Sequence, residues 1–274
     1  MCAVGSVGMT SGLARFHDLL LSLAWRDIRV RYKQSMLGVA WAVVLPLSMM
    51  LVFTFVFTRA IDARGVLHVH MPYALFAYSG LVPWAFFSSS LGGAVNSLVA
   101  NRNLVTKVYF PREVFPLSCI ASAFVDFCVA MAVLVGLMAY FHLRGAWSFT
   151  PTPAIAFLPV VIFVQVVLTI GLGMILAMAN LFYRDVRQIF GAGIQLLMFV
   201  SAVVVPTPSD GTKLAKVIAI NPLSPIINAY RDCIIFGRFP EPGPFLYATV
   251  VAVMTLAVGW LLFRRASYKF AECI

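Results

Sequence analysis

Charged residues are scarce in this chain of 274 residues, where Lys, Arg, Asp and Glu together make up 11% and hydrophobic residues 62%. A soluble domain averages about 25% charged and roughly 45–50% apolar residues, so this chain has too little polar surface to cover a globule in water. The same abundance of Leu, Val, Ile and Phe excludes an intrinsically disordered chain. A soluble enzyme is therefore excluded, and the composition indicates a protein that folds in lipid.

The chain also lacks the sequence patterns of common nucleotide and metal sites. No Lys follows a Gly, which excludes a phosphate-binding loop of the Walker type. The five cysteines form no CxxC pair, and His68 and His70 lie near no carboxylate except Asp62, so neither a disulfide framework nor a metal site is indicated. Gly171 and Gly173 lie in an apolar stretch and indicate close helix packing instead of a dinucleotide-binding loop. We expect no catalytic residue, metal or cofactor in this chain.

Residues 11–33 are predicted to form an amphipathic helix at the membrane surface. At about 100° per residue, apolar side chains fall on one arc of this segment and charged ones on the opposite arc. The segment is too charged to cross lipid, and Trp25 with the basic run through Lys33 suits the cytoplasmic headgroup layer. Packing on a soluble partner is the alternative. No signal-peptide pattern precedes it, so we expect the first span to direct insertion.

Six apolar stretches are predicted to cross the membrane, because a spanning helix needs about 20 residues for about 30 Å of hydrocarbon. Five are long, and the sixth, 188–205, is marginal; the long ones are 36–58, 73–100, 114–143, 153–180 and 245–263. We therefore expect an all-α integral membrane protein in which residues 1–274 form a single transmembrane domain with a six-span bundle over 36–263.

The longest connection, residues 206–244, is predicted to form short re-entrant helices in the outer leaflet before the last span. Its apolar part, 217–236, leaves a seventh span as the alternative. Pro222 and Pro225 remove backbone donors, and the adjacent charges of Arg231 and Asp232 are costly at mid-bilayer. These features favour the re-entrant arrangement.

The net charge of +10 is interpreted as a topological signal. With six spans and both ends inside, the inner segments carry 13 of the 20 Lys and Arg residues and the outer segments 7. This bias predicts that both termini are cytoplasmic, and no nucleic-acid partner is expected. Asp126 is the ionisable residue near the middle of a span; a functional role is possible, but a structural bond to a neighbouring helix is the favoured interpretation.

Four polar joints between the spans carry the most specific pattern. They are RDIRVRYKQSMLGVAWAVVLPL at 26–47, NSLVANRNLVTKVYFPREVFPLS at 96–118, NLFYRDVRQIF at 180–190 and NPLSPIINAYRDCIIFG at 221–237. Together, in this order and spacing, they resemble the membrane subunit of ABC type-2 exporters, and within that group the permeases that export lipid-linked polysaccharides such as O-antigen or teichoic acid. The similarity runs from about Leu23 to Phe263.

The resemblance implies a homodimer of six-span subunits in the bacterial cytoplasmic membrane, with a continuous channel between them. It also implies two copies of a separate ATPase subunit, which would bind ATP and Mg, and a coupling helix at 101–113 that docks on that ATPase. Apolar residues of this cytoplasmic loop stand between basic ones, which is typical of a docking surface. The alternative is a loop tucked under the bundle. The docking candidates are Leu104, Val105, Lys107, Val108, Tyr109, Phe110 and Arg112.

The passenger is predicted from aromatic and basic residues. Sugar rings stack on aromatic side chains, so the candidates for lining the channel are Trp41, Phe53, Phe57, Tyr78, Trp84, Phe87, Phe190 and Phe199. Many of these would equally suit a lipid-facing or interfacial position. A lipid pyrophosphate needs a cationic dock at the inner leaflet, and the candidates are Arg26, Arg29, Arg31 and Lys33, which positive-inside anchoring explains as well.

We therefore expect a polysaccharide-exporting permease whose partners are membrane lipids, a lipid-linked glycan, a second copy of the chain and the ATPase. Export of a small drug or lipid is the first alternative. A membrane-embedded lipid-modifying enzyme is the second, and it predicts a cluster of His, Asp or Glu at one membrane face, which the sequence does not contain.

Overall fold

The computed structural model describes residues 7–33, 40–56, 72–102, 104, 111–148, 152–203, 218–267 and 270, with side chains for all of these except 7–15, 31–33 and 42. Within these ranges all regular structure is helical. The elements are α1 Val7–Lys33, α2 Ala40–Phe55, α4 Tyr73–Ala100, α6 Val114–Leu143, η2 Pro153–Phe157, α7 Leu158–Phe182, α8 Val186–Val200, α10 Leu223–Arg231, η3 Asp232–Phe236 and α11 Pro242–Ala266.

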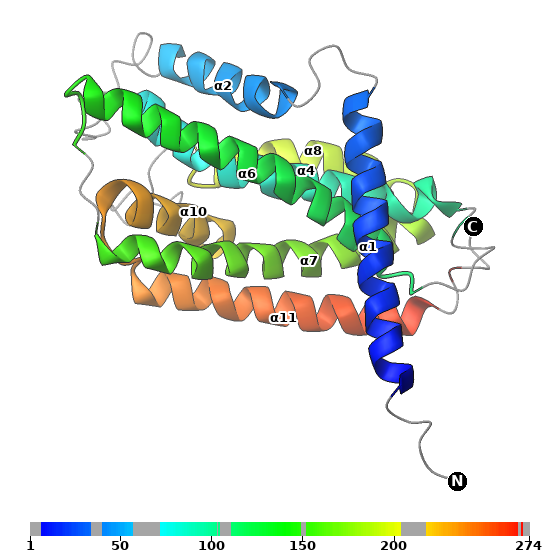
Figure 1. Ribbon diagram of the computed structural model, residues 1–274. Helices are drawn as coiled ribbons and strands as arrows, with labels where there is room; N and C mark the ends of the chain where they lie inside the picture. The colour runs from blue at the N-terminus through cyan, green and yellow to red at the C-terminus, as the bar shows by residue number, and fades with distance from the viewer. Residues whose placement is uncertain are drawn as a thin grey trace.

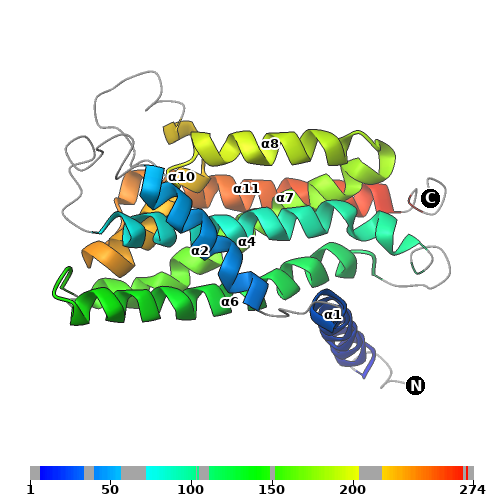
Figure 2. The ribbon, with the colours of Figure 1, turned by 90° about the horizontal axis from the view of Figure 1, so that it is seen from above.

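Four helices of the described residues are long and apolar enough to cross a membrane: α4, α6, the continuous pair η2 and α7, and α11, with 28, 30, 30 and 25 residues. At about 1.5 Å per residue the shortest reaches about 37 Å, more than the roughly 30 Å of hydrocarbon. They lie side by side in Figures 1 and 2. The predicted spans 73–100 and 114–143 match α4 and α6, and 153–180 and 245–263 fall inside the other two helices.

The other two predicted spans appear as shorter apolar helices. The stretch 36–58 contains α2 with 16 residues, and 188–205 overlaps α8, which has 15 residues and ends at Val200 because Ser201 adopts extended backbone angles. Helices of this length measure about 22–24 Å, so neither crosses about 30 Å of hydrocarbon by itself. In the segment 206–244, α10 and η3 together are also too short to cross, and they end at Gly237, whose φ of 61° favours glycine.

The central helix of the bundle is α4. Its neighbours include α2, α6, α7, α8 and α10, and it buries side chains along its whole length. Polar bonds join it to α7 at two levels: Gln165 Nε2 donates to the carbonyl of Pro83 at 2.7 Å, and Asn180 Nδ2 donates to that of Val95 at 2.8 Å. The Gln165 Oε1 atom accepts a bond of 2.6 Å from the Tyr230 hydroxyl, which ties α10 to the same core. In lipid such polar groups find partners only within the protein.

The predicted close packing at Gly171 is confirmed. A Cβ atom on Gly171 would lie 2.5 Å from the backbone nitrogen of Leu256, and one on Gly259 would lie 2.5 Å from the carbonyl oxygen of Gly171. The backbones of α7 and α11 therefore touch at these two glycines. Gly173, half a turn away, is likewise close to Ala94 and Ile120, so α4 and α6 meet α7 at the same level.

The helix predicted at 11–33 is present as α1 and begins earlier, at Val7. It crosses one end of the bundle steeply instead of running along it (Figure 1). Ala24 is buried and Leu23 packs on a second apolar cluster, the inner-end cluster, which consists of Leu98, Phe115, Met174, Ala177, Leu181, Phe263 and Phe270. The face with Trp25, Arg26 and Arg29 is exposed. Thus α1 and the end of α11 lie at the same end of the molecule (Figures 1 and 2).

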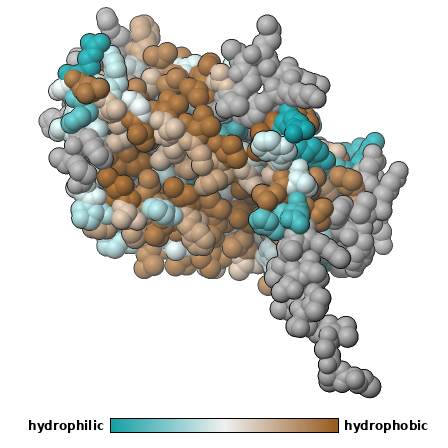
Figure 3. All heavy atoms as spheres, in the orientation of Figure 1, coloured by the Kyte–Doolittle hydropathy of each residue, from teal (hydrophilic) through white to brown (hydrophobic). Residues whose placement is uncertain are grey.

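The outer surface of the bundle is apolar in the middle and polar towards its ends. Figure 3 shows apolar residues over the side of the bundle, with hydrophilic residues near α1 and at the opposite end. Large apolar side chains such as Val135, Phe163, Val253 and Met254 are exposed on this surface. In water such a patch would be a liability, whereas a bilayer covers it.

Replacing Gly171 by Ala is expected to destabilise the protein. The new Cβ would clash with backbone atoms of α11, and a backbone cannot move aside as a flexible side chain can. Overpacking of this kind costs about 1–3 kcal/mol. Thermal unfolding of the purified protein in detergent measures the effect. The matched control is Gly136→Ala in α6, where nothing lies within 4 Å of the new Cβ. Equal unfolding midpoints for the two variants would contradict the close contact.

Candidate functional site

A cavity of about 490 Å³ opens between α2, α4 and α6, and α8 contributes Met198 to its lining. Its walls are mostly apolar, with polar atoms from a few side chains. We call it the lateral cavity; its aromatic and polar lining residues are Trp41, Trp84, Phe86, Phe127, Ser88, Ser89 and Asp126. Its surface thus combines apolar ring faces with two hydroxyls and a carboxyl.

The lateral cavity brings together residues that are far apart in the sequence. Trp41, from the start of α2, is 43% exposed, while Trp84 is buried with its ring centroid 6.1 Å from that of Phe87. Asp126, the carboxyl predicted near the middle of a span, lines the same space from α6. Indole faces stack on the C–H faces of sugars, and hydroxyls and carboxylates bond sugar hydroxyls. Chemically, this cavity is suited to a sugar ring or an apolar chain.

Four of the other predicted lining residues are buried or half-buried within the subunit. Tyr78 and Phe87 are buried inside the subunit's own bundle, and the Tyr78 hydroxyl donates to the Ala130 carbonyl at 3.5 Å. Both rings therefore pack against residues of the same chain. Phe53 is half-buried against the main core, and Phe190 is half-buried with its ring near Gly92 of α4.

Phe199 differs from these residues because it is 69% exposed on α8. No residue of α8 is fully buried, and besides Phe199 this helix exposes Ile189 and Leu196. Phe57 lies outside the described residues.

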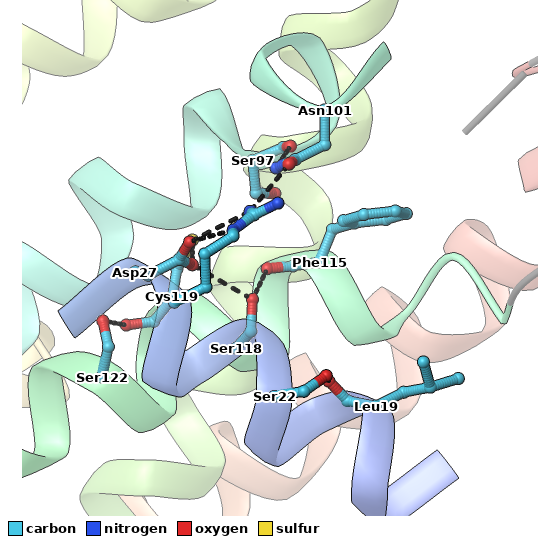
Figure 4. A network of polar contacts seen from close by, with 10 residues as sticks. Leu19, Ser22, Asp27, Ser97, Asn101, Phe115, Ser118, Cys119 and Ser122 are labelled. Atoms are coloured by element: carbon cyan, nitrogen blue, oxygen red, sulfur yellow. Dashed lines mark hydrogen bonds and ion pairs between the residues drawn. The ribbon is translucent and has the colours of Figure 1, made fainter. Parts of the chain in front are cut away.

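A polar network joins α1 to the ends of α4 and α6, and Figure 4 shows it from close by. Arg26 Nη2 donates to Asp27 Oδ1 at 3.0 Å and to Asn101 Oδ1 at 2.8 Å. The other carboxylate oxygen of Asp27 accepts from Ser118 Oγ at 3.5 Å and from Cys119 Sγ at 3.9 Å, which are long contacts. We call these five residues the inner network.

The inner network contacts the predicted coupling segment 101–113 at its first residue, Asn101, and the chain just after it, at Ser118. Asn101 is the residue at which α4 ends: its Nδ2 donates to the Ser97 carbonyl at 2.8 Å, and its own carbonyl accepts from the Leu104 amide at 2.9 Å. Ser118 lies in the second turn of α6, just after that segment. A displacement of the segment therefore acts on both attachments of α1.

Of the docking candidates, the structure describes Leu104 and Arg112. Leu104 packs on the inner-end cluster, and the Arg112 guanidinium lies over the Phe270 ring, 5.7 Å from its centroid. Both therefore hold the ends of the segment against the bundle. Val105, Lys107, Val108, Tyr109 and Phe110 lie outside the described residues.

The basic residues proposed for a pyrophosphate have different surroundings. The Arg26 guanidinium is bound by Asp27 and Asn101, while that of Arg29 is exposed and lies 5.9 Å from the Trp25 ring centroid. Arg31 and Lys33 belong to the last turn of α1, and their side chains lie outside the described part of the chain.

Sequence reasoning missed the role of Asp27. It lies on the same face of α1 as Leu23 and Ala24, one turn further along, and that face packs against α6. A carboxylate on the packed arc of an amphipathic helix indicates a polar partner opposite. This signal was present in the sequence, but the partners Ser118 and Cys119 became visible only through the packing of α1.

The family model described as ABC-2 type transporter matches residues 18–235. The chain is 30% identical over 274 residues to an O-antigen export system permease protein RfbA of Klebsiella pneumoniae, covering 98% of this chain and 100% of that protein. It is 31% identical over 266 residues to the protein of the same name from Myxococcus xanthus, covering 96% and 97%. It is 25% identical over 249 residues to the polysialic acid transport protein KpsM of Escherichia coli, covering 89% and 91%.

The family match begins inside α1 and ends in η3, so it includes the inner network, the lateral cavity and α10. The match covers most of the chain. This chain belongs to the ABC-2 type transporter family.

Proposed function

We propose that this chain is the membrane-spanning subunit of an ATP-driven exporter that moves lipid-linked polysaccharide across the bacterial cytoplasmic membrane. The observation that carries the proposal is similarity along almost the whole chain to proteins named for O-antigen export and polysialic acid transport. The sugar-compatible surface of the lateral cavity supports a glycan as the passenger.

The proposed topology has six spans and cytoplasmic termini. It is supported by the inner-end cluster, in which Leu23 of α1 packs near Phe263 of α11, since an even number of crossings returns the chain to its starting side. The short helices α2 and α8 would cross together with adjoining residues or where the bilayer thins. The helices α10 and η3 would enter the outer leaflet without crossing it.

The proposed assembly is a homodimer with two copies of an ATPase subunit, which would bind ATP and Mg. Support comes from α8, which buries no residue in its own subunit and exposes Ile189, Leu196 and Phe199. The second copy would cover this face and enclose the path between the subunits. The ATPase would dock on the segment 101–113 from the cytoplasm.

In this assembly the inner network would carry the ATPase's movement to α1. A push on the coupling segment moves Asn101 and Ser118, and the Arg26–Asp27 pair holds α1 to both. Since α1 crosses the inner end of the bundle, it would shift at the level of the lipid headgroups, where the glycan's pyrophosphate arrives. Arg26 would then hold α1 to the end of α4, whereas the exposed Arg29, with Arg31 and Lys33, would bind the pyrophosphate.

Deleting the gene is expected to leave polysaccharide inside the cell, and the wild-type chain should restore it to the surface. Staining of intact and permeabilised cells with a glycan-specific antibody measures this. The tagged wild-type chain should also co-purify with an ATPase in mild detergent. The proposal fails if the purified chain alone hydrolyses ATP, or if surface polysaccharide is normal in the deletion strain.

The variant Asp27→Asn is expected to lower export by about threefold to tenfold, since partly exposed charge-assisted bonds contribute about 1 kcal/mol each. ATPase co-purification and ATP hydrolysis should stay unchanged, because the docking surface is intact. Asp18→Asn is the matched control: it removes the same charge from α1 where the side chain is 81% exposed. If both variants export alike, the inner network does not transmit movement.

The double variant Arg29→Gln with Arg31→Gln is expected to abolish export while dimer assembly and ATPase docking persist. The reason is loss of the cations that would neutralise the pyrophosphate at the inner leaflet. The double variant Arg264→Gln with Arg265→Gln is the control, because it removes two exposed cations from the end of α11 at the same membrane face. If the two double variants export equally, the role of Arg29 and Arg31 is positive-inside anchoring alone.

A further inference from the structure

Arg231, the last residue of α10, is a buried cation. It is 2% exposed, and the adjacent Asp232 does not neutralise it directly, because the Asp232 carboxylate accepts a bond of 2.7 Å from Arg238 Nε. A guanidinium is not deprotonated in proteins, so this side chain remains charged. A charge in such a place persists only if other groups compensate it.

Backbone carbonyls and an aromatic ring supply that compensation. Arg231 Nη1 donates to the carbonyl of Ala202, and Nη2 donates to that of Val203 at 2.6 Å. A longer contact of 3.4 Å reaches the carbonyl of Phe76, and the guanidinium lies 3.8 Å from the centroid of the Phe76 ring. The residues 201–203 follow directly on α8, where a helix end leaves carbonyls without helical partners.

Gly80 makes room for this contact. A Cβ atom at Gly80 would lie 2.6 Å from the Val203 carbonyl oxygen and 3.2 Å from Arg231 Cζ. Any larger residue would push the guanidinium away from the carbonyls. The contact of α10 with the end of α8 therefore depends on a glycine in α4, one turn after Phe76.

At the other end of α10, Asn221 bonds the residue that precedes this carbonyl pair. Asn221 Nδ2 donates to Ser201 Oγ at 2.7 Å, and Ser201 Oγ donates to the carbonyl of Leu197 in the last turn of α8 at 2.6 Å. The Asn221 Oδ1 atom also accepts from the Leu223 amide at 3.1 Å, which starts α10. Residues 201–203 are therefore bonded once by Asn221, just before α10, and twice by Arg231, at its end. We call Ser201, Ala202, Val203, Asn221 and Arg231 the outer clamp.

The outer clamp matters because α8 is packed against the subunit along one face only. None of its residues is fully buried, although Ile194, Leu197 and Met198 pack against the main core, so the clamp adds polar bonds at the outer end of a partly packed helix. In contrast, α10 is buried almost throughout and is joined to α7 by the bond from Tyr230 to Gln165. Pulling the end of α8 away from α10 would leave a buried guanidinium without its carbonyls, so the two elements should move together.

We propose that Arg231 is a positioning residue that makes α10 and the outer end of α8 one rigid body, which opens the outer side of the transport path as a unit. The inference rests on the proposed function, since it assigns α8 to the path between two subunits. This movement involves no covalent chemistry. Arg231 acts through the placement of α8 and does not contact the glycan.

The first test measures export and ATP hydrolysis in the complex with the ATPase. Arg231→Gln and Gly80→Ala should each lower export at least about tenfold, because each frees the end of α8. ATP hydrolysis should change by less than about twofold, so ATP would be used without transport. The double variant should export no less than the more impaired of the two single variants, because both substitutions remove the same contact. Arg231→Lys, which keeps the charge but has no planar fork, should export at an intermediate level.

Two controls match these variants. Gly136→Ala adds the same methyl group in α6 where nothing lies within 4 Å, and Arg144→Gln removes an exposed arginine just after α6. Both should export normally. Export by Gly80→Ala equal to that of Gly136→Ala would overturn the proposal, as would multiplicative losses in the double variant. Loss of the assembled complex in Gly80→Ala would also overturn it, because the contact would then serve folding alone.

The second test measures rigidity without relying on transport. Spin labels at Phe199→Cys and Phe236→Cys, both exposed positions, are introduced into a chain whose native cysteines are replaced by serine. Labelled chains are diluted with unlabelled ones in lipid vesicles so that the distance within one chain is read by pulsed electron spin resonance.

The expected result is one narrow distance, the same with and without ATP trapped in the ATPase, which broadens when Gly80→Ala is added. A wild-type distance that changes on ATP trapping, or a distribution unaffected by Gly80→Ala, overturns the rigid body. If the wild-type complex moves no glycan, the proposed function fails, while the broadening by Gly80→Ala in vesicles still decides whether the clamp exists.

Discussion

Inside a bilayer a polar atom has no water to bond, and this constraint governs the whole structure. It explains why the described backbone is helical, because a helix pairs its own amides and carbonyls. It also explains where the buried polar side chains lie. Gln165, Asn180 and Tyr230 each bond a backbone or side-chain group on another helix, so every such residue fixes a contact between two elements.

The two polar groupings that do not simply join spans lie at opposite ends of the bundle. At the inner end, Arg26 and Asp27 hold α1 to the ends of α4 and α6. At the other end, Arg231 holds α10 to the residues that follow α8. Between them the molecule is apolar and tightly packed around α4, with Gly171 and Gly259 bringing α7 and α11 into backbone contact. Such packed interiors move as units, which suits a subunit driven from one end.

The lateral cavity and α8 are the loosely packed parts of this arrangement. The cavity lies where α2 crosses α4 and α6 obliquely, as Figure 2 shows, so the side chains do not fill the space between them. A transport path between two subunits would use such surfaces, since a fully packed core has no room for a chain of sugars. The indole rings and the single carboxyl of Asp126 give this space a chemistry that differs from the rest of the apolar interior.

Hydropathy by itself was sufficient for the four long apolar helices, because stretches such as 73–100 and 114–143 contain at most one charged residue and are followed by polar ones. The amphipathic period placed α1, and the four joints indicated the family. The partners of individual side chains were beyond such reasoning. Arg26 bonds Asn101, and Arg231 bonds carbonyls near residue 202, across 75 and 29 positions of sequence. Backbone carbonyls carry no sequence signal, and the space left by Gly80 exists only once α4 lies beside α10. Tertiary packing therefore decided which charges bind neighbours and which aromatic rings are buried, because both depend on distances between helices that no local pattern encodes.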